Sequence, residues 1–343
     1  MTENEIINPF PLPDKDGCIA RNVKRIAHLD LPGGAQIVSQ NGIIFIGHMS
    51  PPSGTSIIDV RDPKNPSPLK TLRLPDDQSH SHKVVVSGDL MLVNNQRDQR
   101  KFFRKGENLF DIRKALIAQL GRSPTDAELG HRLGVGTKDL DRLLKGIKRG
   151  YQTGGFRIFD ISNPANPRQI SFQHTGGDGA HGFDFDGRYA YVSTEMEGFR
   201  GNILVNYDLF NPSKPQMVSQ WHLPGQEAPD STVTSPIDGN WIHHALRVKD
   251  TLWVAGCQAG VFAVDIADIA NPVTLGSYNY HPPFVESTHT AMALPQKFQG
   301  SDLALVIDEE HGNHPAGQPH AALWIFDITD PGTMKPISVF EVS

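Results

Sequence analysis

The chain repeats one short pattern five times, and this repetition constrains its fold more than any other feature. Each copy is a β-rich stretch that ends in an aspartate and runs into a proline-rich turn, as in RIFDISNPANPRQI at residues 157–170. The five aspartates are Asp59, Asp160, Asp208, Asp265 and Asp327. Because Asp-Pro and Asn-Pro pairs favour turns, each copy predicts a strand, a turn and a second strand.

A second β-rich stretch precedes each copy of the pattern. Four of these stretches, such as SHKVVVSGDLMLV at 81–93, have the alternation and tight turn of a β-hairpin, and the fifth has a longer connection. Each repeat therefore supplies four antiparallel strands, which is one blade of a β-propeller. We predict an all-β fold, a β-propeller of about five four-stranded blades with a small α-helical insertion in blade two.

The repeated pattern resembles the LVIVD-repeat β-propellers, whose blades carry a signature of the form gLxIxDvsdPxnPxxlg. Residues 157–170 and 262–276 match it closely, and the resemblance covers nearly everything from residue 25 onward apart from one insertion. It implies the propeller fold and leaves the activity open, because propellers host unrelated functions. Residues 25–33 and 336–343 both have the pattern of an outermost strand, so the closing strand is left open.

The insertion lies between the second and third strands of blade two. Equivalent strand starts are 99 positions apart there, against 46 between blades one and two. Helical spacing of apolar residues begins at Ile112, Thr125 and Glu128 form a capping box, and Thr137 starts a further helix. We therefore divide the chain into an N-terminal extension at 1–24, a propeller at 25–98 and 152–343, and a helical subdomain at 99–151.

The inserted subdomain is basic, with 13 Lys and Arg against 6 Asp and Glu in residues 99–151. Its stretch LGRSPTDAELGHRLGVGTKDLDRLLKG resembles the helix-turn-helix segments of sigma-type regulators, which makes DNA contact a formal alternative. Its place within a blade instead favours a lid or a contact between copies in a homo-oligomer. Arg97, Arg100 and Lys101 at its root either attract an anionic substrate or form a solvated surface.

Histidines recur at the start of the innermost strand. His82, His181, His244 and His289 hold this position in blades two to five, and Gln36 holds it in blade one. Innermost strands line the channel of a propeller, so we expect four imidazoles to converge near the axis. Neutral imidazole binds Zn, Cu, Fe and Ni. The pattern predicts a metal site at these four histidines; the alternative is a structural histidine inherited by each duplicated blade.

Carboxylates are expected near such a site, because four neutral ligands leave the charge of a divalent ion uncompensated. The second strand of a blade ends on the face where the first begins, and Glu195, Glu309 and Glu310 stand at such ends. We predict Glu195 and Glu309 as supporting catalytic carboxylates with Glu310 behind them, the alternative being solvated loop carboxylates. His243, beside the ring, is predicted as a catalytic proton-transfer group or alternative ligand.

The all-histidine site is similar in geometry to that of the carotenoid-cleavage oxygenases, where four histidines hold ferrous iron. The selenium-binding protein and methanethiol oxidase family is a second comparison, and the sequence motifs of neither family occur in the chain. The similarity favours a metal-dependent oxygenase or oxidase acting on a small organic molecule, with iron ahead of copper, manganese or zinc. A non-redox lyase or hydrolase comes second, and a non-catalytic propeller that binds a protein partner is the remaining alternative.

Composition excludes several other classes. The net charge of −6 argues against a nucleic-acid partner, and no window approaches the roughly 18 apolar residues that span a membrane. With 2 cysteines and no basic region followed by an apolar run at the N-terminus, neither a disulfide framework nor export is indicated. We therefore predict a cytoplasmic protein with no membrane partner.

Overall fold

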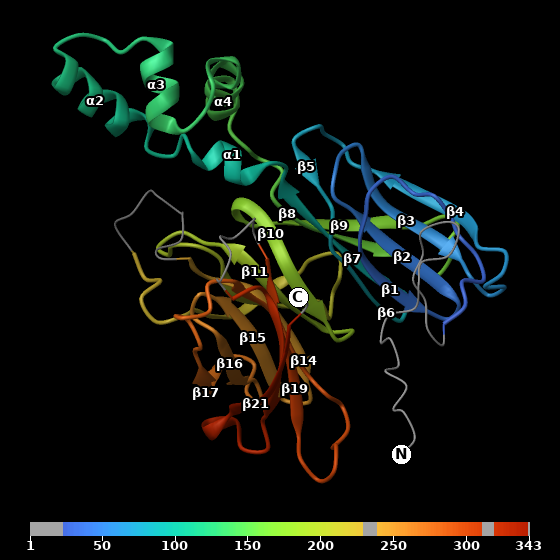
Figure 1. Ribbon diagram of the computed structural model, residues 1–343. Coiled ribbons are helices and arrows are strands. Elements are labelled where there is room, and N and C mark those ends of the chain that lie inside the picture. The colour runs from blue at the N-terminus through green and yellow to red at the C-terminus, as the bar shows by residue number, and fades with distance from the viewer. Residues whose placement is uncertain (1–22, 229–238, 311–318, 342–343) are drawn as a thin grey trace, which may run out of the picture.

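The computed structural model describes residues 23–228, 239–310 and 319–341. In this part of the chain, five antiparallel units of four strands follow one another, each with its strands in chain order from inside to outside (Figure 1). Blade one consists of β1 (Gly34–Gln40), β2 (Ile43–His48), β3 (Ser53–Asp59) and β4 (Ser67–Arg73). Blade two consists of β6 (Val84–Ser87), β7 (Leu90–Arg97), β8 (Gly155–Asp160) and β9 (Arg168–His174), with the short β5 (Ser79–His80) beside β7.

The other three blades have the same order. Blade three consists of β10 (Gly176–Phe185), β11 (Tyr189–Glu195), β12 (Ile203–Asp208) and β13 (Gln216–Trp221). Blade four consists of β14 (Asn240–Val248), β15 (Thr251–Cys257), β16 (Val261–Asp265) and β17 (Val273–Tyr278). Blade five consists of β18 (Ser287–Ala293), β19 (Leu303–Glu309), β20 (Ala322–Asp327) and β21 (Lys335–Glu341). The predicted all-β propeller of five four-stranded blades is confirmed.

The repeated aspartate ends the third strand of each blade and fixes the turn after it. Its carboxylate accepts a hydrogen bond from the backbone N–H two residues further on, as at Asp160 and Ser162 over 3.0 Å and at Asp208 and Phe210 over 2.7 Å. The same bond occurs at the other three aspartates. A side chain that satisfies its own turn directs the chain into the outer strand, which explains why the repeat keeps this residue type.

The outermost strand of blade five is β21, at the end of the chain. Residues 23–33 form no strand, although their sequence pattern is similar. The C-terminal segment is thus the one that completes the last blade.

The apolar core is divided among the interfaces between successive blades. Phe45 and Ile57 of blade one pack with Val84 and Met91 of blade two, and similar buried clusters join blades two and three, three and four, and four and five. Burial of these side chains is the main favourable term in holding neighbouring blades together. No such cluster among the described residues joins blade five to blade one.

The inserted residues form four helices between β7 and β8: α1 (Arg100–Arg104), α2 (Leu109–Leu120), α3 (Asp126–Leu133) and α4 (Thr137–Arg149). The predicted capping box is present, since Thr125 and Glu128 bond reciprocally at the start of α3. Helices α2 to α4 share a small apolar core of their own, and α1 lies against the blades (Figure 1). None of the helices in the described ranges has the length and apolar character to cross a membrane.

Candidate metal centre

The innermost strands are irregular at the register where the sequence places the ring residues. Pairing shifts between Gly34 and Ile37 in β1, and similar shifts occur around the histidines of β10, β14 and β18. In blade two the inner strand is interrupted there, between β5 and β6. Bulges re-aim side chains and concentrate near functional sites. The irregularities turn the ring residues of the blades toward one space.

That space is a cavity of about 840 Å³ lined by all five blades. Gln36 of blade one lies in its wall, and so do six histidines of the other blades: His80, His82, His181, His243, His244 and His289. The four ring histidines predicted from the sequence are therefore brought together. The structure adds His80 and, more centrally, His243.

Three imidazoles approach one another closely enough to share an ion. The nitrogen atoms that His243, His244 and His289 offer lie within 4.8 Å of one another. Nitrogen ligands of one zinc ion are at most about 4.2 Å apart, twice the metal–nitrogen distance. The three nitrogens would therefore have to come slightly closer together to bind one ion. The structure thus gives His243 a place among the candidate ligands, where the sequence analysis made it a proton-transfer group or an alternative ligand.

The two consecutive histidines share the cavity because β14 is not a regular strand. In a regular strand neighbouring side chains point to opposite faces. The pairing of β14 with β15 shifts between Asn240 and His244, and both His243 and His244 line the cavity. The irregular strand therefore contributes two candidate ligands from adjacent positions.

His181 is oriented by Gln96, the residue before the end of β7. Gln96 Oε1 lies 2.9 Å from His181 Nδ1 and 3.1 Å from His80 Nε2. A carbonyl oxygen only accepts, so both ring nitrogens donate to it. The Nε2 of a neutral His181 then carries the lone pair, and it lies 2.8 Å from His243 Nε2. His181 can therefore act as a fourth ligand.

The metal-free hydrogen bonds form one directed chain. With Nε2 of His181 accepting, His243 donates from its own Nε2 over 2.8 Å. His243 Nδ1 then accepts from His244 Nδ1, 3.0 Å away. In this chain of hydrogen bonds, the Nε2 atom of His244 carries no proton and keeps its lone pair. Binding an ion at these rings would replace imidazole–imidazole hydrogen bonds by metal–nitrogen bonds.

His82, a predicted ligand, has a different partner. The Asn94 side chain accepts from the backbone N–H of Lys83 over 2.8 Å and donates to the carbonyl of Ala180 over 3.1 Å, which fixes its amide. The same amide nitrogen lies 3.1 Å from His82 Nδ1 and donates to it. A neutral His82 then carries its proton on Nε2. This arrangement makes His82 a hydrogen-bond donor in the cavity wall rather than a ligand.

Burial keeps these imidazoles neutral. The pKa of each of His82, His181, His243 and His244 is well below the ordinary value of 6.5, first because burial disfavours the charged ring. Nearby positive charges lower the pKa of each ring further, with Lys83 acting on all four. Only the neutral imidazole has a lone pair for an ion, so the environment favours the ligating form.

The predicted carboxylates lie in three different surroundings. Glu309, at the end of β19, lines the cavity. Glu310 is exposed and lies 3.1 Å from His320 Nδ1, and it is not part of the cavity wall. His311 and His314 of the same segment lie outside the described residues. Glu309 is thus the predicted carboxylate that shares the cavity with the histidines.

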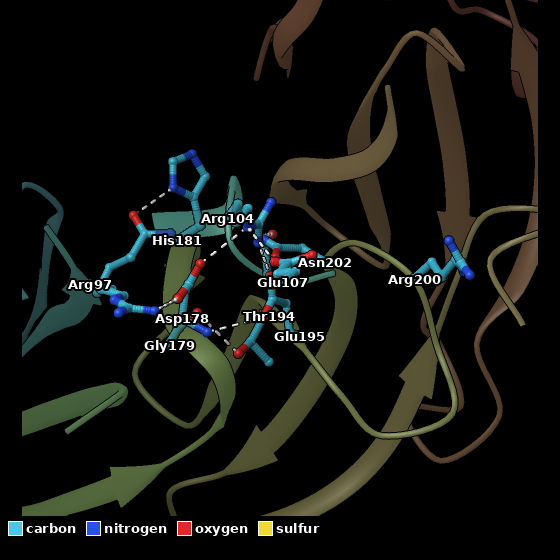
Figure 2. A network of polar contacts seen from close by, with 12 residues as sticks. Arg97, Arg104, Glu107, Asp178, Gly179, His181, Thr194, Glu195, Arg200 and Asn202 are labelled. Atoms are coloured by element: carbon cyan, nitrogen blue, oxygen red, sulfur yellow. Dashed lines mark hydrogen bonds and ion pairs between the residues drawn. The ribbon is translucent and has the colours of Figure 1, made fainter. Parts of the chain in front are cut away.

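Glu195 holds the insertion and does not support the imidazoles, so its predicted role needs correction. Its carboxylate accepts from the backbone N–H of Asp178 over 3.0 Å and pairs with Arg104 of α1. Figure 2 shows Arg97 and Arg104 turned toward Asp178, with the ring of His181 pointing away from Glu195. A buried carboxylate needs such partners, and here they come from the inserted helix.

The start of the insertion forms part of the cavity wall. Gln99, Arg100 and Lys101 all line it, so α1 carries basic side chains to the histidines. The Arg100 guanidinium lies 4.7 Å from the centre of the Trp241 ring, and that ring is 5.1 Å from the His181 ring. Burial lowers the pKa of Arg100 to about 10 and that of Lys83 to about 8. Both groups remain cationic at neutral pH.

The sequence analysis missed Asn94, Gln96 and Lys83. Asn94 and Gln96 belong to a run of polar residues at the end of β7, and a buried amide on the strand beside a histidine was the available signal. Lys83 follows His82 directly and precedes an apolar run of three valines. Cys257, at the end of β15, is buried, and burial raises the pKa of its thiol, which keeps it protonated.

Five four-stranded blades around one cavity define a β-propeller. The model of the LVIVD repeat matches residues 150–172, which include β8 and most of β9. No curated protein matches the sequence.

Solved structures with the same architecture have very different sequences. A crystal structure of a protein from Lactobacillus plantarum has a TM-score of 0.54 at 11% identity and covers 97% of this chain and 77% of that one. The designed protein Ika8 has a TM-score of 0.47 at 7% identity, and Sqt1 of Saccharomyces cerevisiae one of 0.48 at 6%. These two alignments cover 90% and 88% of this chain and 61% and 60% of the partner chains. Such likeness describes fold alone.

Proposed function

We propose that the chain is a metal-dependent enzyme that transforms a small organic substrate in the central cavity. A divalent transition metal would bind at His243, His244 and His289, with His181 as a fourth ligand. The observation that carries this proposal is the approach of three imidazoles, two of them buried, within 4.8 Å beside a cavity of about 840 Å³. A cavity of that size holds a small organic molecule.

The type of donor atom limits which metal ions the site would bind. Nitrogen-only ligands suit Fe, Cu, Zn and Ni, whereas Mg²⁺ and Ca²⁺ require oxygen ligands. We favour iron, then copper, manganese or zinc. A metal held by three or four histidines on one side keeps positions for substrate, which supports an oxygenase or oxidase first and a non-redox lyase or hydrolase second.

This chain's own residues would have distinct tasks. Gln96 holds the His181 ring so that Nε2 faces the cluster. His82 presents an N–H donor to a substrate oxygen, and Glu309 is the carboxylate placed to take or return a proton in the cavity. The predicted contact between copies through the inserted helices stays a prediction.

Measurement of the bound metal tests the proposal. Protein purified without a histidine tag would be analysed by mass spectrometry for bound metals, beside the double variant His244→Ala, His289→Ala. We expect about one Fe, Cu, Mn or Zn per chain in the wild type and loss of it in the variant. The matched control is His131→Ala, an exposed histidine of α3, which should keep the metal.

The same preparation separates the chemistries. Turnover that consumes dioxygen with a redox-active ion supports the oxygenase or oxidase, and turnover without dioxygen supports the lyase or hydrolase. A wild type without metal after reconstitution with each of the four ions contradicts the proposal. The propeller would then be treated as a scaffold for a protein partner.

A further inference from the structure

Basic side chains line the same cavity as the histidines. Lys83 follows β5 in blade two, and Arg100 begins α1 of the insertion, 17 residues later in the chain. Both line the cavity with the histidine cluster. Two neighbouring segments of blade two, beside β6 and after β7, thus bring cationic side chains to one space.

Neither cation has a hydrogen-bonded or ion-paired partner in the described part of the chain. Among the described residues, the side chains of Lys83 and Arg100 make no hydrogen bond and no ion pair within 4.0 Å. A half-buried guanidinium has five N–H donors to satisfy. An arginine beside a cavity whose N–H donors have no acceptor is typical of a group that binds a ligand.

Trp241 holds the guanidinium in place. The Arg100 guanidinium lies 4.7 Å from the centre of this ring, a cation–π distance. The same ring lies 5.1 Å from His181 and 5.3 Å from His243, measured between ring centres. Arg100 is therefore preorganised over the residues that contact the candidate ligands.

The charge balance of the wall fits one negative charge. Its cationic side chains are Lys83, Arg100 and Lys101, and its carboxylates are Asp98 and Glu309, which leaves one excess positive charge. Any divalent ion bound by neutral imidazoles would increase the excess.

We propose that the cavity binds a small organic carboxylate, with Arg100 and Lys83 holding the carboxylate group and the Trp241 face beside it. This inference rests on the proposed function, since the same cavity would hold the metal and the reacting part of the substrate. A planar guanidinium matches the two oxygens of a carboxylate. In the metal-free protein the wall carries a single excess charge, so a monoanion fits it better there than a phosphate dianion.

Calorimetric titration of the full-length, metal-free protein tests the carboxylate site by itself. The probes are benzoate, its neutral isostere benzamide, and inorganic phosphate. We expect benzoate to bind at least about tenfold more tightly than benzamide, because charge-assisted hydrogen bonds are stronger than neutral ones. Phosphate should bind more weakly than benzoate.

Variants identify the groups that bind the carboxylate. Arg100→Gln and Lys83→Gln should each weaken benzoate at least about tenfold and leave benzamide unchanged. Arg113→Gln and Lys114→Gln, exposed on α2, are the matched controls and should bind benzoate as the wild type does. Metal content should be the same in all four variants, since none of these side chains is a candidate ligand.

The outcomes separate the two proposals. If metal is bound but benzoate binds no better than benzamide, or Arg100→Gln binds it as the wild type does, the carboxylate site is wrong and the metal centre stands. If benzoate binds as expected but no metal does, the carboxylate site stands and the proposed enzyme is wrong. Tighter binding of phosphate than of benzoate would overturn the choice of a carboxylate.

Discussion

The histidine cluster has two halves that look equivalent along the chain and differ in their partners. His82 and His181 come from blades two and three, and side-chain amides hold their Nδ1 atoms. His243, His244 and His289 come from blades four and five, and the ligand atoms of these three lie within 4.8 Å of one another. Side-chain amides bond to the rings of the first half, whereas the rings of the second half face one another.

The two amides act in opposite ways. Asn94 donates to His82 and so places the ring proton on the cavity side, whereas Gln96 accepts from His181 and so places the lone pair there. The position of a histidine on its strand therefore does not decide whether it can bind a metal. The group on its other nitrogen does.

The largest expected effect compares one histidine of each half. His244→Ala should lower metal affinity on the order of 100-fold or more, which is the share of one ligand in the roughly 10–16 kcal/mol of a four-ligand zinc site. His82→Ala should change metal affinity by less than about threefold, because a ring protonated on its cavity side is no ligand. Competition with a chromophoric chelator measures both. Equal losses in the two variants would mean that His82 is a ligand and that the two halves do not differ.

The next effect concerns the carboxylate that holds the insertion. Glu195→Gln removes the charge that pairs with Arg104 and should lower the free energy of unfolding by about 2 kcal/mol, the usual contribution of a hydrogen bond to a charged group. It should leave metal content unchanged, because Glu195 is not in the cavity wall. Chemical denaturation and metal analysis of the same sample provide the two readings. Loss of metal without loss of stability would restore the role predicted from the sequence.

The fold could be predicted because the sequence of one turn recurs five times along the chain. The aspartate that ends each third strand satisfies the backbone of its own turn, so sequence and structure coincide locally. The helical insertion could be predicted in the same way, from the capping box of Thr125 and Glu128. Such local interactions can be identified from the sequence alone.

The site was predictable only in part, because its details depend on irregular and distant contacts. Strand periodicity places His243 and His244 on opposite faces, and only the pairing shift in β14 brings both to the cavity. Glu195 stands at the expected strand end, but its partner Arg104 comes from 91 residues earlier, on the inserted helix. Neither a register shift nor a contact at that separation follows from residue types.

A smaller effect is shared by both halves and appears as a pH dependence. The pKa of buried His82 and of His244 is well below 6.5 in the folded protein, so the unfolded chain binds more protons as the pH falls below 6.5. The metal-free protein should therefore be fully stable above pH 6.5. Below that pH it should lose about 1.4 kcal/mol per pH unit for each such histidine, until the folded pKa is reached.

Thermal denaturation of the metal-free protein between pH 5 and pH 8 measures this loss. His82→Gln and His244→Gln should each reduce the slope below pH 6.5 by about 1.4 kcal/mol per pH unit. A slope that changes in only one of the two variants would show that burial differs between the halves. The pairing with amides or imidazoles would then not be their main distinction.

The smallest effect that we expect comes from replacing Gln96, whose amide orients His181 beside His243. Gln96→Leu removes the acceptor for His181 Nδ1, so the His181 proton is free to move to Nε2, the atom 2.8 Å from His243. Metal affinity should fall about tenfold, the low end of the range for a residue that orients a ligand. Gln96→Glu keeps an acceptor at the same place and should restore most of the affinity. If the two variants lose affinity equally, Gln96 serves packing alone, and His181 belongs with His82 in the half that does not bind metal.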